Sequence, residues 1–508
     1  MNTCRIRAFA VSFLLVSSLS YSQTKAAISP DLRTEHYMQS VRANVPLLAA
    51  FLREMPKGGD LHYHLSGGIY AETMITWAAE AKLCVVTQTL QLVQPPCNEA
   101  AGNVPAENAL GDPVLYRKII DAWSMRNWQL SGQSGHDHFF DTFSKFGPAG
   151  DGHTGDMLAE AARRAAQNHE IYQELMFTAD DGKVAGVGKQ VGWIDDFKTM
   201  RETLLANGLL DAVEAGRRNI DAAEKQRDAD LQCGSDKPDP ACKVTQRVIY
   251  QVLRGIPKQM VFAQILAGFE MASRDPRVVG FNLVMPEDYY VPMRDYDLHM
   301  RIIDFLKPLY PKVHITLHAG ELAPGLVPPD GLSFHIREAV EQGHAERIGH
   351  GVDVMEENRA TDLLKEMAKR GVMVEINLTS NDVILGVKGK EHPLATYLKF
   401  GVPVALSTDD EGVSRSDLSM EYLKSVTDQD LSYAQLKGMA RTSLEHAFVA
   451  GGSLWSDNRK FVRVKECATD KPTAETTKAS CSEYLRANEK ARLQWELEKE
   501  FASFEARY

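Results

Sequence analysis

Short stretches in which apolar and polar residues alternate recur along the chain and predict β-strands. The clearest is 313–318, where valine, isoleucine and leucine alternate with His314, Thr316 and His318, a period of two that is typical of a strand. Comparable runs predict strands at 60–65, 171–177, 244–253, 278–284, 347–350, 372–378 and 402–407. Helical spacing separates most of them, at 258–273, 296–306 and 361–370. This alternation favours the α/β class and a (β/α)₈ TIM barrel.

Further helical patterns surround the barrel. We expect helices over 30–55 and 195–227, mostly helix with loops over 66–165, and a helical tail from about 416 that includes 487–505. The predicted organisation is an N-terminal helical segment at 23–55, a barrel domain at 56–450 and a helical C-terminal extension at 451–508. Within the barrel domain, insertions are expected at about 84–155 and 228–243.

The first residues have the layout of a cleavable secretory signal. Arg5 and Arg7 precede an apolar run from Ala8 to Leu19, and small residues follow before Gln23. The run is too short to cross a bilayer as a helix. We therefore predict a signal peptide over 1–22 and an exported protein, either periplasmic or fully secreted.

The cysteines support export. Without Cys4, six of the seven remain, and they fall as three pairs of neighbours: Cys84 and Cys97, Cys233 and Cys242, Cys467 and Cys481. An even number in an exported chain predicts disulfides, and three local loops are the simplest of the fifteen connectivities. Buried reduced thiols are the alternative.

Composition narrows the classes of partner. The chain has 508 residues, 44% of them hydrophobic and 25% charged, which is typical of a globular protein with a substantial core. Its formal net charge is −11, so nucleic acids and anionic membranes are disfavoured as partners. A small neutral or cationic ligand fits better, and a homodimer is left open.

Candidate chemistry gathers where the predicted strands end, which is where a TIM barrel builds its active site. Three histidines and an aspartate there suit Zn²⁺ with one position left for water, and the metal would lower the pKa of that water. A further histidine would orient or deprotonate the water, and a glutamate would deliver a proton. The three histidines and the aspartate are His62, His64, His318 and Asp409, the further histidine is His350, and the glutamate is Glu321. Asp410 follows Asp409 at the same strand end.

Each of these residues also has a structural interpretation. The Asp409-Asp410 pair could be a helix N-cap and its solvated neighbour, and His350 could be a tight-turn residue. His136-Asp137-His138 imitates the first histidine motif but falls in a predicted helix-loop region, where it would cap a helix or face solvent. The functional reading rests on all the features following separate strands in one order.

Five segments together resemble the signature motifs of a known family. They are Met55-Pro-Lys57, His62-x-His64-Leu65, His318-Ala-Gly320-Glu321, Ile348-Gly-His350-Gly351 and Ser407-Thr-Asp409-Asp410. The set, spread over about 55–450, is similar to the adenosine deaminase family of metal-dependent amidohydrolases. The predicted signal, the insertions and the segment 279–283 look closest to its exported, growth-factor-type branch.

The resemblance implies a zinc-dependent hydrolase that converts adenosine, and 2′-deoxyadenosine, to inosine and ammonia. It implies one Zn²⁺ on His62, His64, His318 and Asp409. Glu321 would protonate N1 of the purine and His350 would position the attacking hydroxide. The implied substrate-binding residues are His64, Ser66, Gly320, which lets the purine approach the backbone, and Asp410, which accepts a hydrogen bond from the N7 side.

Three segments depart from the family pattern and leave the sugar side open. Ser66 stands where much of the family has an acidic residue, 285–288 lacks the usual glycine, and 377–381 keeps a Ser-Asn pair without a preceding Cys-Pro. Adenine or a 5′-modified adenosine are therefore alternative substrates.

Three other functions fit the sequence less well. A binuclear esterase or lactonase would need a lysine after the fourth strand, which 285–288 does not contain, and His344-Ala-Glu346 lacks the Pro-Cys-x-x-Cys of a cytidine-type deaminase. An exported signalling or binding protein that keeps the fold is the non-enzymatic alternative.

Overall fold

The computed structural model describes residues 28–474 and 477–508, together with Met1. The predicted signal peptide thus lies outside the described residues, apart from Met1. Within the described part, no helix is both long enough and apolar enough to cross a membrane.

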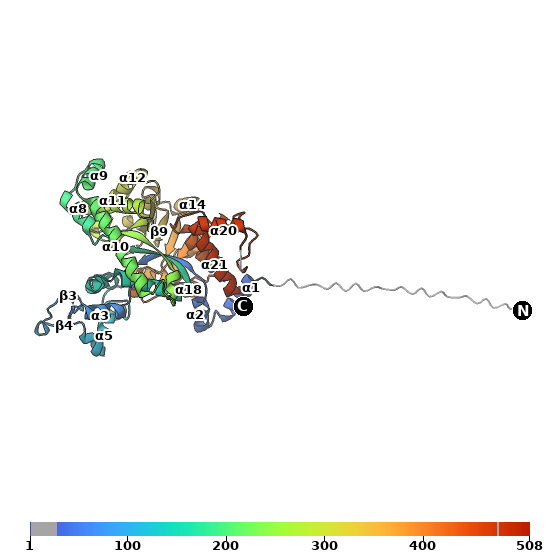
Figure 1. The fold of residues 1–508 in the computed structure, drawn as a ribbon, viewed down its shortest axis with the longest axis horizontal. Coiled ribbons are helices and arrows are strands. Elements are labelled where there is room, and N and C mark those ends of the chain that lie inside the picture. Colours follow the sequence, from blue (N-terminus) through green and yellow to red (C-terminus); the bar gives the residue numbers. More distant parts are fainter. Residues whose placement is uncertain (2–27, 475–476) are drawn as a thin grey trace.

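Eight parallel strands form the central sheet, in the order β1-β5-β6-β7-β8-β9-β10-β11. An isolated parallel bridge between Tyr63 and Asp409 joins the first strand to the segment after the last, so the sheet closes on itself. This confirms the (β/α)₈ barrel (Figure 1). The strands are β1 Gly58–His64, β5 Glu170–Phe177, β6 Thr245–Leu253, β7 Val278–Val284, β8 His314–Ala319, β9 Arg347–His350, β10 Met373–Ile376 and β11 Val404–Leu406.

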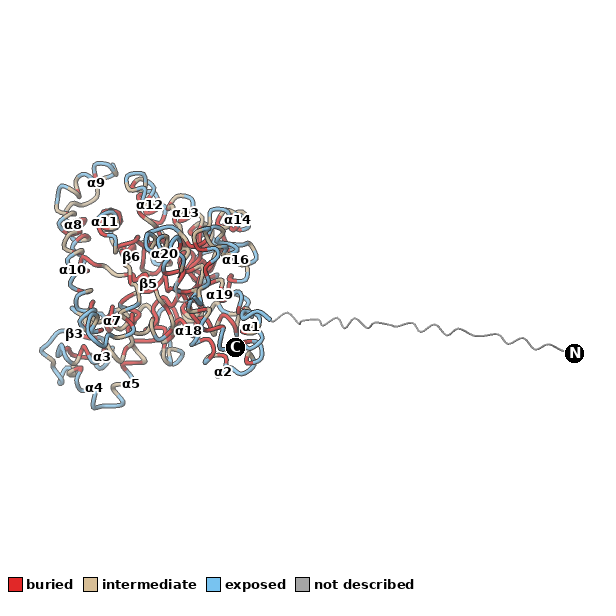
Figure 2. The backbone as a smooth tube through the Cα atoms, turned by 45° about the vertical axis from the view of Figure 1, so that its right-hand side comes forward, coloured by how far each residue is buried: buried red, intermediate tan, exposed pale blue. Residues whose placement is uncertain are grey.

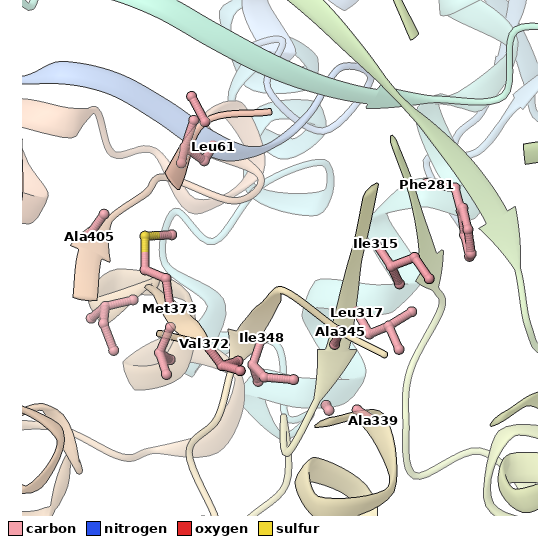
Figure 3. Close-up of a cluster of buried hydrophobic side chains, with 14 of the residues drawn as sticks. Leu61, Phe281, Ile315, Leu317, Ala339, Ala345, Ile348, Val372, Met373 and Ala405 are labelled. Carbon is pink, nitrogen blue, oxygen red and sulfur yellow. The ribbon is translucent and has the colours of Figure 1, made fainter. Parts of the chain in front are cut away.

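Alternation along β8 explains how the barrel positions its polar residues. Ile315 and Leu317 are fully buried in the main apolar cluster with Ala339 of α13 (Figure 3), whereas successive side chains of a strand point to opposite faces. Thr316 and His318 therefore face the other way, where they bond to Glu375 and Asn282. The period-two pattern in the sequence separates packing residues from site residues.

Helices surround the strands, and burial is concentrated in the barrel (Figure 2). The helices between strands are α7 Thr154–Gln167, α8 Lys183–Val191, α9 Phe197–Ala206, α10 Leu209–Asp230, α11 Lys258–Arg274, α12 Tyr290–Leu306, α13 His335–Glu341, α14 Ala360–Arg370, α15 Leu378–Leu385 and α16 Leu394–Phe400. After β11 come α17 Glu411–Ser414, α18 Leu418–Gln429 and α19 Tyr433–His446.

The first insertion contains more than the predicted helices and loops. It includes a three-stranded antiparallel sheet in the order β3-β2-β4, which lies beside α3 and α5 at one end of the molecule (Figure 1). These strands have only two or three residues each, too few to show a period. The elements are α3 Ala71–Glu80, β2 Cys84–Val86, β3 Leu92–Val93, β4 Asn103–Pro105, α4 Asn108–Gly111, α5 Pro113–Ala122 and α6 Gly135–Phe146.

Two long predicted helices are each divided in two. The segment 30–55 forms α1 Pro30–Val41 and α2 Val45–Arg53, because the Asn44 side chain caps a new helix by accepting from the Leu47 N–H. The segment 195–227 is divided at Gly208, whose φ of +95° ends one helix before α10 begins. Apolar spacing continues across both breaks, so periodicity alone does not reveal them.

The described part of 451–508 contains a short hairpin and loops as well as the predicted helices. Helices α20 Ala479–Ala487 and α21 Glu489–Glu505 follow a pair of short antiparallel strands, β12 Trp455–Asp457 and β13 Val462–Arg463. The predicted strand over 372–378 was also too long, because Leu378 already begins α15. The three predicted disulfides are present: Cys84–Cys97, Cys233–Cys242 and Cys467–Cys481.

Candidate active site

Closure of the barrel brings four predicted metal ligands together. The Asp409 N–H donates to the carbonyl of His62, and the His64 N–H donates to the carbonyl of Asp409, so the ends of β1 and β11 hold their side chains in register. One donor atom from each of His62, His64, His318 and Asp409 lies within 4.8 Å of the other three. His64 Nε2 is 3.2 Å from His318 Nε2 and 3.3 Å from Asp409 Oδ1.

The hydrogen bonds of the three imidazoles fit a cation at this centre. The Nδ1 atom of His62 lies 2.6 Å from Glu375 Oε2, that of His318 3.0 Å from Asn282 Oδ1, and that of His64 3.3 Å from Gln251 Oε1. Each Nδ1 therefore carries the proton and each Nε2 lone pair faces the others. His62 Nε2 is buried without a hydrogen-bond partner. Three converging lone pairs and a carboxylate match the donor set of Zn²⁺.

A buried ionic network holds the carboxylate of Glu375, which orients His62. Glu375 accepts from Arg347 Nε at 2.7 Å and from Thr316 Oγ1 at 2.9 Å, and Arg347 also reaches Glu174 Oε2 at 2.6 Å. Burial opposes the charge of Glu375, but the Arg347 guanidinium outweighs it and holds the pKa of that carboxyl below its usual value. Glu375 is therefore a carboxylate that fixes the tautomer of His62.

The Asp409 side chain is oriented by a residue of the segment after β10. Its Oδ2 accepts a 2.6 Å hydrogen bond from Ser380 Oγ, which leaves Oδ1 directed at His62 and His64. The Ser-Asn pair noted in the sequence thus has a structural role, since its second member, Asn381, donates from Nδ2 to His350 Nδ1 at 2.9 Å. With Nδ1 accepting, His350 carries its proton on Nε2.

Glu321 and His350 lie on the same side of the ligand cluster. His350 Nε2 is 3.7 Å from Glu321 Oε1, and both join Asp409 in a second close group of donor atoms. Burial, followed by the neighbouring charges of Asp409 and Glu287, raises the pKa of the Glu321 carboxyl well above its usual value. A carboxyl that stays protonated near neutral pH can act as a proton donor.

The segment 285–288, which lacks the glycine common in the family, positions Glu321 through the side chain of Glu287. The Glu287 carboxylate accepts from the backbone N–H groups of Gly320, at 3.2 Å, and Glu321, at 2.8 Å. Gly320 itself has a φ of +74°, and a Cβ there would lie 2.4 Å from Asp353 Oδ1. The glycine is therefore required by packing behind the site. Its contact with a purine stays a prediction.

A cavity of about 300 Å³ opens onto this group. Gly320 is not among its lining residues, whereas the other predicted substrate-binding residues are. Burial, and then the charge of Asp409, raises the pKa of the Asp410 carboxyl well above its usual value. The predicted site residues that line the cavity are His64, Ser66, His318, Glu321, His350, Asp409 and Asp410.

The opposite wall of the cavity was not predicted from the sequence. It comes from α6, through Phe139, Phe140 and Phe143, and from the 285–289 loop between β7 and α12, through Met285, Pro286 and Tyr289. Three phenylalanines at positions i, i+1 and i+4 of a helix share one face, and that spacing was the available signal. The aromatic side chains make this wall apolar.

The histidine pair at 136 and 138 does not face solvent, and only His138 contacts the end of a helix, α5. Both residues are buried in α6. His136 Nε2 lies 3.0 Å from Asp288 Oδ1, and His138 Nε2 donates to the carbonyls of Asp121 and Ser124. The structure therefore corrects the expectation of exposure, because Asp288 covers α6 at His136, and Asp121 and Ser124 cover it at His138.

Known proteins support the interpretation of this geometry. The family model described as adenosine deaminase matches residues 205–453. The chain contains a domain of the adenosine deaminase family. The match begins after the first two ligands, so His62 and His64 are placed by the fold alone. Membership of the growth-factor-type branch stays a prediction.

The relatives of this chain differ in the substrates that their names give. An adenine deaminase of Sinorhizobium medicae is 26% identical over 295 residues, which are 58% of this chain and 74% of the relative. An adenosine deaminase of Salmonella heidelberg is 38% identical over 140 residues, 27% of this chain and 39% of the relative. The chain thus spans less than half the length of that second relative.

A solved structure shares the fold. An amidohydrolase of Burkholderia ambifaria, described with bound Zn, superposes with a TM-score of 0.52 at 14% identity and covers 86% of this chain and 92% of its own. At that identity the likeness concerns the barrel and its surrounding helices.

Proposed function

We propose that this chain is a zinc-dependent hydrolase that deaminates adenosine, and 2′-deoxyadenosine, to inosine and ammonia. The observation that carries the proposal is the convergence of four ligand atoms with Glu321 and His350 beside a cavity of about 300 Å³. The family match and the deaminase relatives support the coarser assignment, a purine deaminase. The choice of adenosine is our finer proposal.

His62, His64, His318 and Asp409 would hold the metal. Bound zinc in the Burkholderia ambifaria amidohydrolase supports this choice of ion. A Zn²⁺ ion held by these residues supplies a Lewis acid that makes water a nucleophile at neutral pH.

The protein's own groups then account for the proton transfers. The His350 Nε2–H donates to the attacking water and orients it towards C6 of the purine. The Glu321 carboxyl gives its proton to N1, which draws electrons away from C6 as the water oxygen adds. One water proton passes to the Glu321 carboxylate and restores its acid form, and the other passes to the amine. The C6–N bond then breaks, the amine leaves as ammonia, and the ring keeps a 6-oxo group with the transferred proton on N1. Asp410, on the same wall, has a raised pKa, so its protonated carboxyl would donate to N7 of the purine, which carries no hydrogen; this reverses the direction that the resemblance implies.

Adenine is the second candidate substrate. The Sinorhizobium medicae relative is named as an adenine deaminase, and Ser66 provides no charge for the ribose side of the cavity. Adenine has no ribose, so it would contact only the side of the cavity that carries the metal ligands.

We further propose that residues 56–450 form the catalytic unit, that the partner is a small purine nucleoside, and that the protein is exported to the periplasm or beyond. The three disulfides support an oxidising compartment.

A substrate panel tests the proposal. Zinc-loaded protein is incubated with adenosine, 2′-deoxyadenosine and adenine, and the 6-oxo products are quantified by chromatography. The highest kcat/KM is expected for adenosine. A higher value for adenine would move the assignment to that base, and no turnover of any of the three by fully zinc-loaded protein would favour a binding role.

A further inference from the structure

His136 connects the apolar wall of the cavity to a loop from the barrel. Its ring is buried, with Nδ1 3.0 Å from Asp137 Oδ1 and Nε2 3.0 Å from Asp288 Oδ1. The ring meets Phe140 edge-on, with centroids 4.9 Å apart, and Tyr289 at 6.4 Å. Phe140 and Tyr289 both line the cavity. One imidazole thus contacts both segments that form the wall.

The same loop continues to the proton donor. Asp288 directly follows Glu287, whose carboxylate accepts from the N–H groups of Gly320 and Glu321. A displacement of residues 285–289 would therefore move the backbone that carries Glu321. The path from α6 to Glu321 consists of two side-chain contacts and one peptide unit.

The start of α6 is positioned closely on its other side. A Cβ at Gly135 would lie 1.8 Å from the carbonyl oxygen of Val383, in α15, so the backbones of the two helices nearly touch. Among the described residues, His136 and Asp288 make the one side-chain hydrogen bond that joins α6 to the 285–289 loop. Backbone packing thus fixes α6 against α15, and this pair fixes it against the loop.

We propose that His136 and Asp288 are a positioning pair, which holds the apolar wall against the 285–289 loop and through that loop keeps Glu321 in place. The inference rests on the proposed function for its kinetic consequences, but the contact itself is independent of the substrate. Neither residue lines the cavity or touches the ligand cluster.

Charge strengthens the pair. Burial alone would lower the pKa of His136, but hydrogen bonds to Asp288 and Asp137 outweigh it and raise that pKa above its usual value. These two carboxylates are the charged groups that face the ring, with the Tyr289 hydroxyl and Asp141 farther along the same wall. The imidazolium is present at low pH and is lost as the pH rises through its raised pKa, so the pair weakens in the alkaline direction.

Three variants separate positioning from general stability. Asp288→Asn keeps an acceptor but removes the charge. His136→Phe keeps the ring packing but removes both hydrogen bonds. Asp137→Asn is the matched control, because it makes the same change in the exposed partner of the same imidazole; the Asp137 side chain is 66% exposed. For each we measure kcat and KM for adenosine against pH, the zinc content, and hydrogen–deuterium exchange of residues 135–146 and 285–289.

The proposal predicts a split between the kinetic constants. His136→Phe is expected to raise KM by about tenfold and Asp288→Asn by about threefold, as expected for a partly buried charged hydrogen bond, with smaller decreases in kcat. Exchange becomes faster in both segments, zinc content is unchanged, and KM no longer rises with pH in His136→Phe. Asp137→Asn behaves nearly as the wild type.

Unchanged exchange and KM in both His136→Phe and Asp288→Asn would overturn the proposal. If His136→Phe loses its circular dichroism signal, Asp288→Asn decides, since it is nearly isosteric. Failure of the wild-type protein to deaminate any 6-aminopurine would refute the proposed function instead, and the exchange measurement would still decide whether the pair holds the wall.

Discussion

The two walls of the cavity are built in different ways. The ligand wall consists of polar side chains at strand ends, and each of its four predicted metal ligands is fixed by a further hydrogen bond, such as that of His62 to Glu375. The opposite wall consists of aromatic side chains on α6, which belongs to an insertion and is fixed by packing and by the His136–Asp288 pair. Under the proposed function, the chemistry would reside on the barrel and contact with the rest of the substrate on the segment that contains α6.

This division predicts that substitutions on the two walls fail in different ways. A change on the ligand wall should affect turnover or metal affinity, because its atoms are in reach of the reacting centre. A change on the apolar wall should affect KM, because it removes only buried contact area.

The largest effect is expected for Glu321→Gln. It keeps the shape of the side chain but removes the acidic proton, so kcat should fall by about 10²- to 10⁴-fold with zinc content unchanged, as measured by steady-state kinetics and metal analysis. Glu202→Gln, on the exposed face of α9, is the control and should match the wild type. Turnover within about threefold of the wild type would remove Glu321 from the mechanism.

Arg347→Met tests the support beneath the ligand wall. It leaves Glu174 and Glu375 buried without their shared cation, which should lower the free energy of unfolding by about 3–5 kcal/mol. Chemical denaturation measures the change. Arg301→Met is the matched control, because it breaks an exposed pair with Asp297 and should cost no more than about 0.5 kcal/mol. Equal costs would contradict the account of a buried ionic network.

Glu375→Gln should weaken zinc without abolishing the fold. It removes the carboxylate that orients His62, and such changes lower metal affinity by about 10- to 100-fold, measured by competition with a chelator. Glu287→Gln provides the contrast: it is expected to lower kcat through Glu321 while zinc affinity stays the same. If both variants lose zinc equally, the support of His62 by Glu375 and the support of Glu321 by Glu287 are not separate.

Phe143→Ala should have the smallest effect. Loss of roughly 40 Å² of apolar contact corresponds to about 1 kcal/mol, or about fivefold in KM, with zinc content and kcat nearly unchanged. Val114→Ala, on a half-exposed position of α5, serves as the control. A larger fall in kcat than rise in KM would show that the apolar wall takes part in the chemistry.

The sequence predicted which residues at the strand ends lie together but did not predict the apolar wall, for a physical reason. Strand ends combine period-two alternation with unusual residues, so the sequence alone places His318 and Asp409 on the barrel. The insertion has short strands, and its helix α6 uses ordinary phenylalanines that could equally have formed a core. Their position depends on contacts with α15 and the 285–289 loop, which are distant in sequence.

The same limit applies to the residues that support the ligands. Glu375, Asn282 and Gln251 lie inside strands with no local feature that marks them. They become recognisable once neighbouring strands are paired. Helix breaks at Asn44 and Gly208 were also missed, because apolar spacing continues through them.

Metal stoichiometry tests the central claim most directly. Wild-type protein and Asp409→Ala are loaded with zinc, dialysed and analysed for metal per chain by atomic emission. The account predicts one zinc in the wild type and its loss in the variant, with folding preserved by circular dichroism. A wild-type chain that retains no zinc, or an Asp409→Ala chain that retains it fully, would contradict a catalytic metal centre at the ends of these strands.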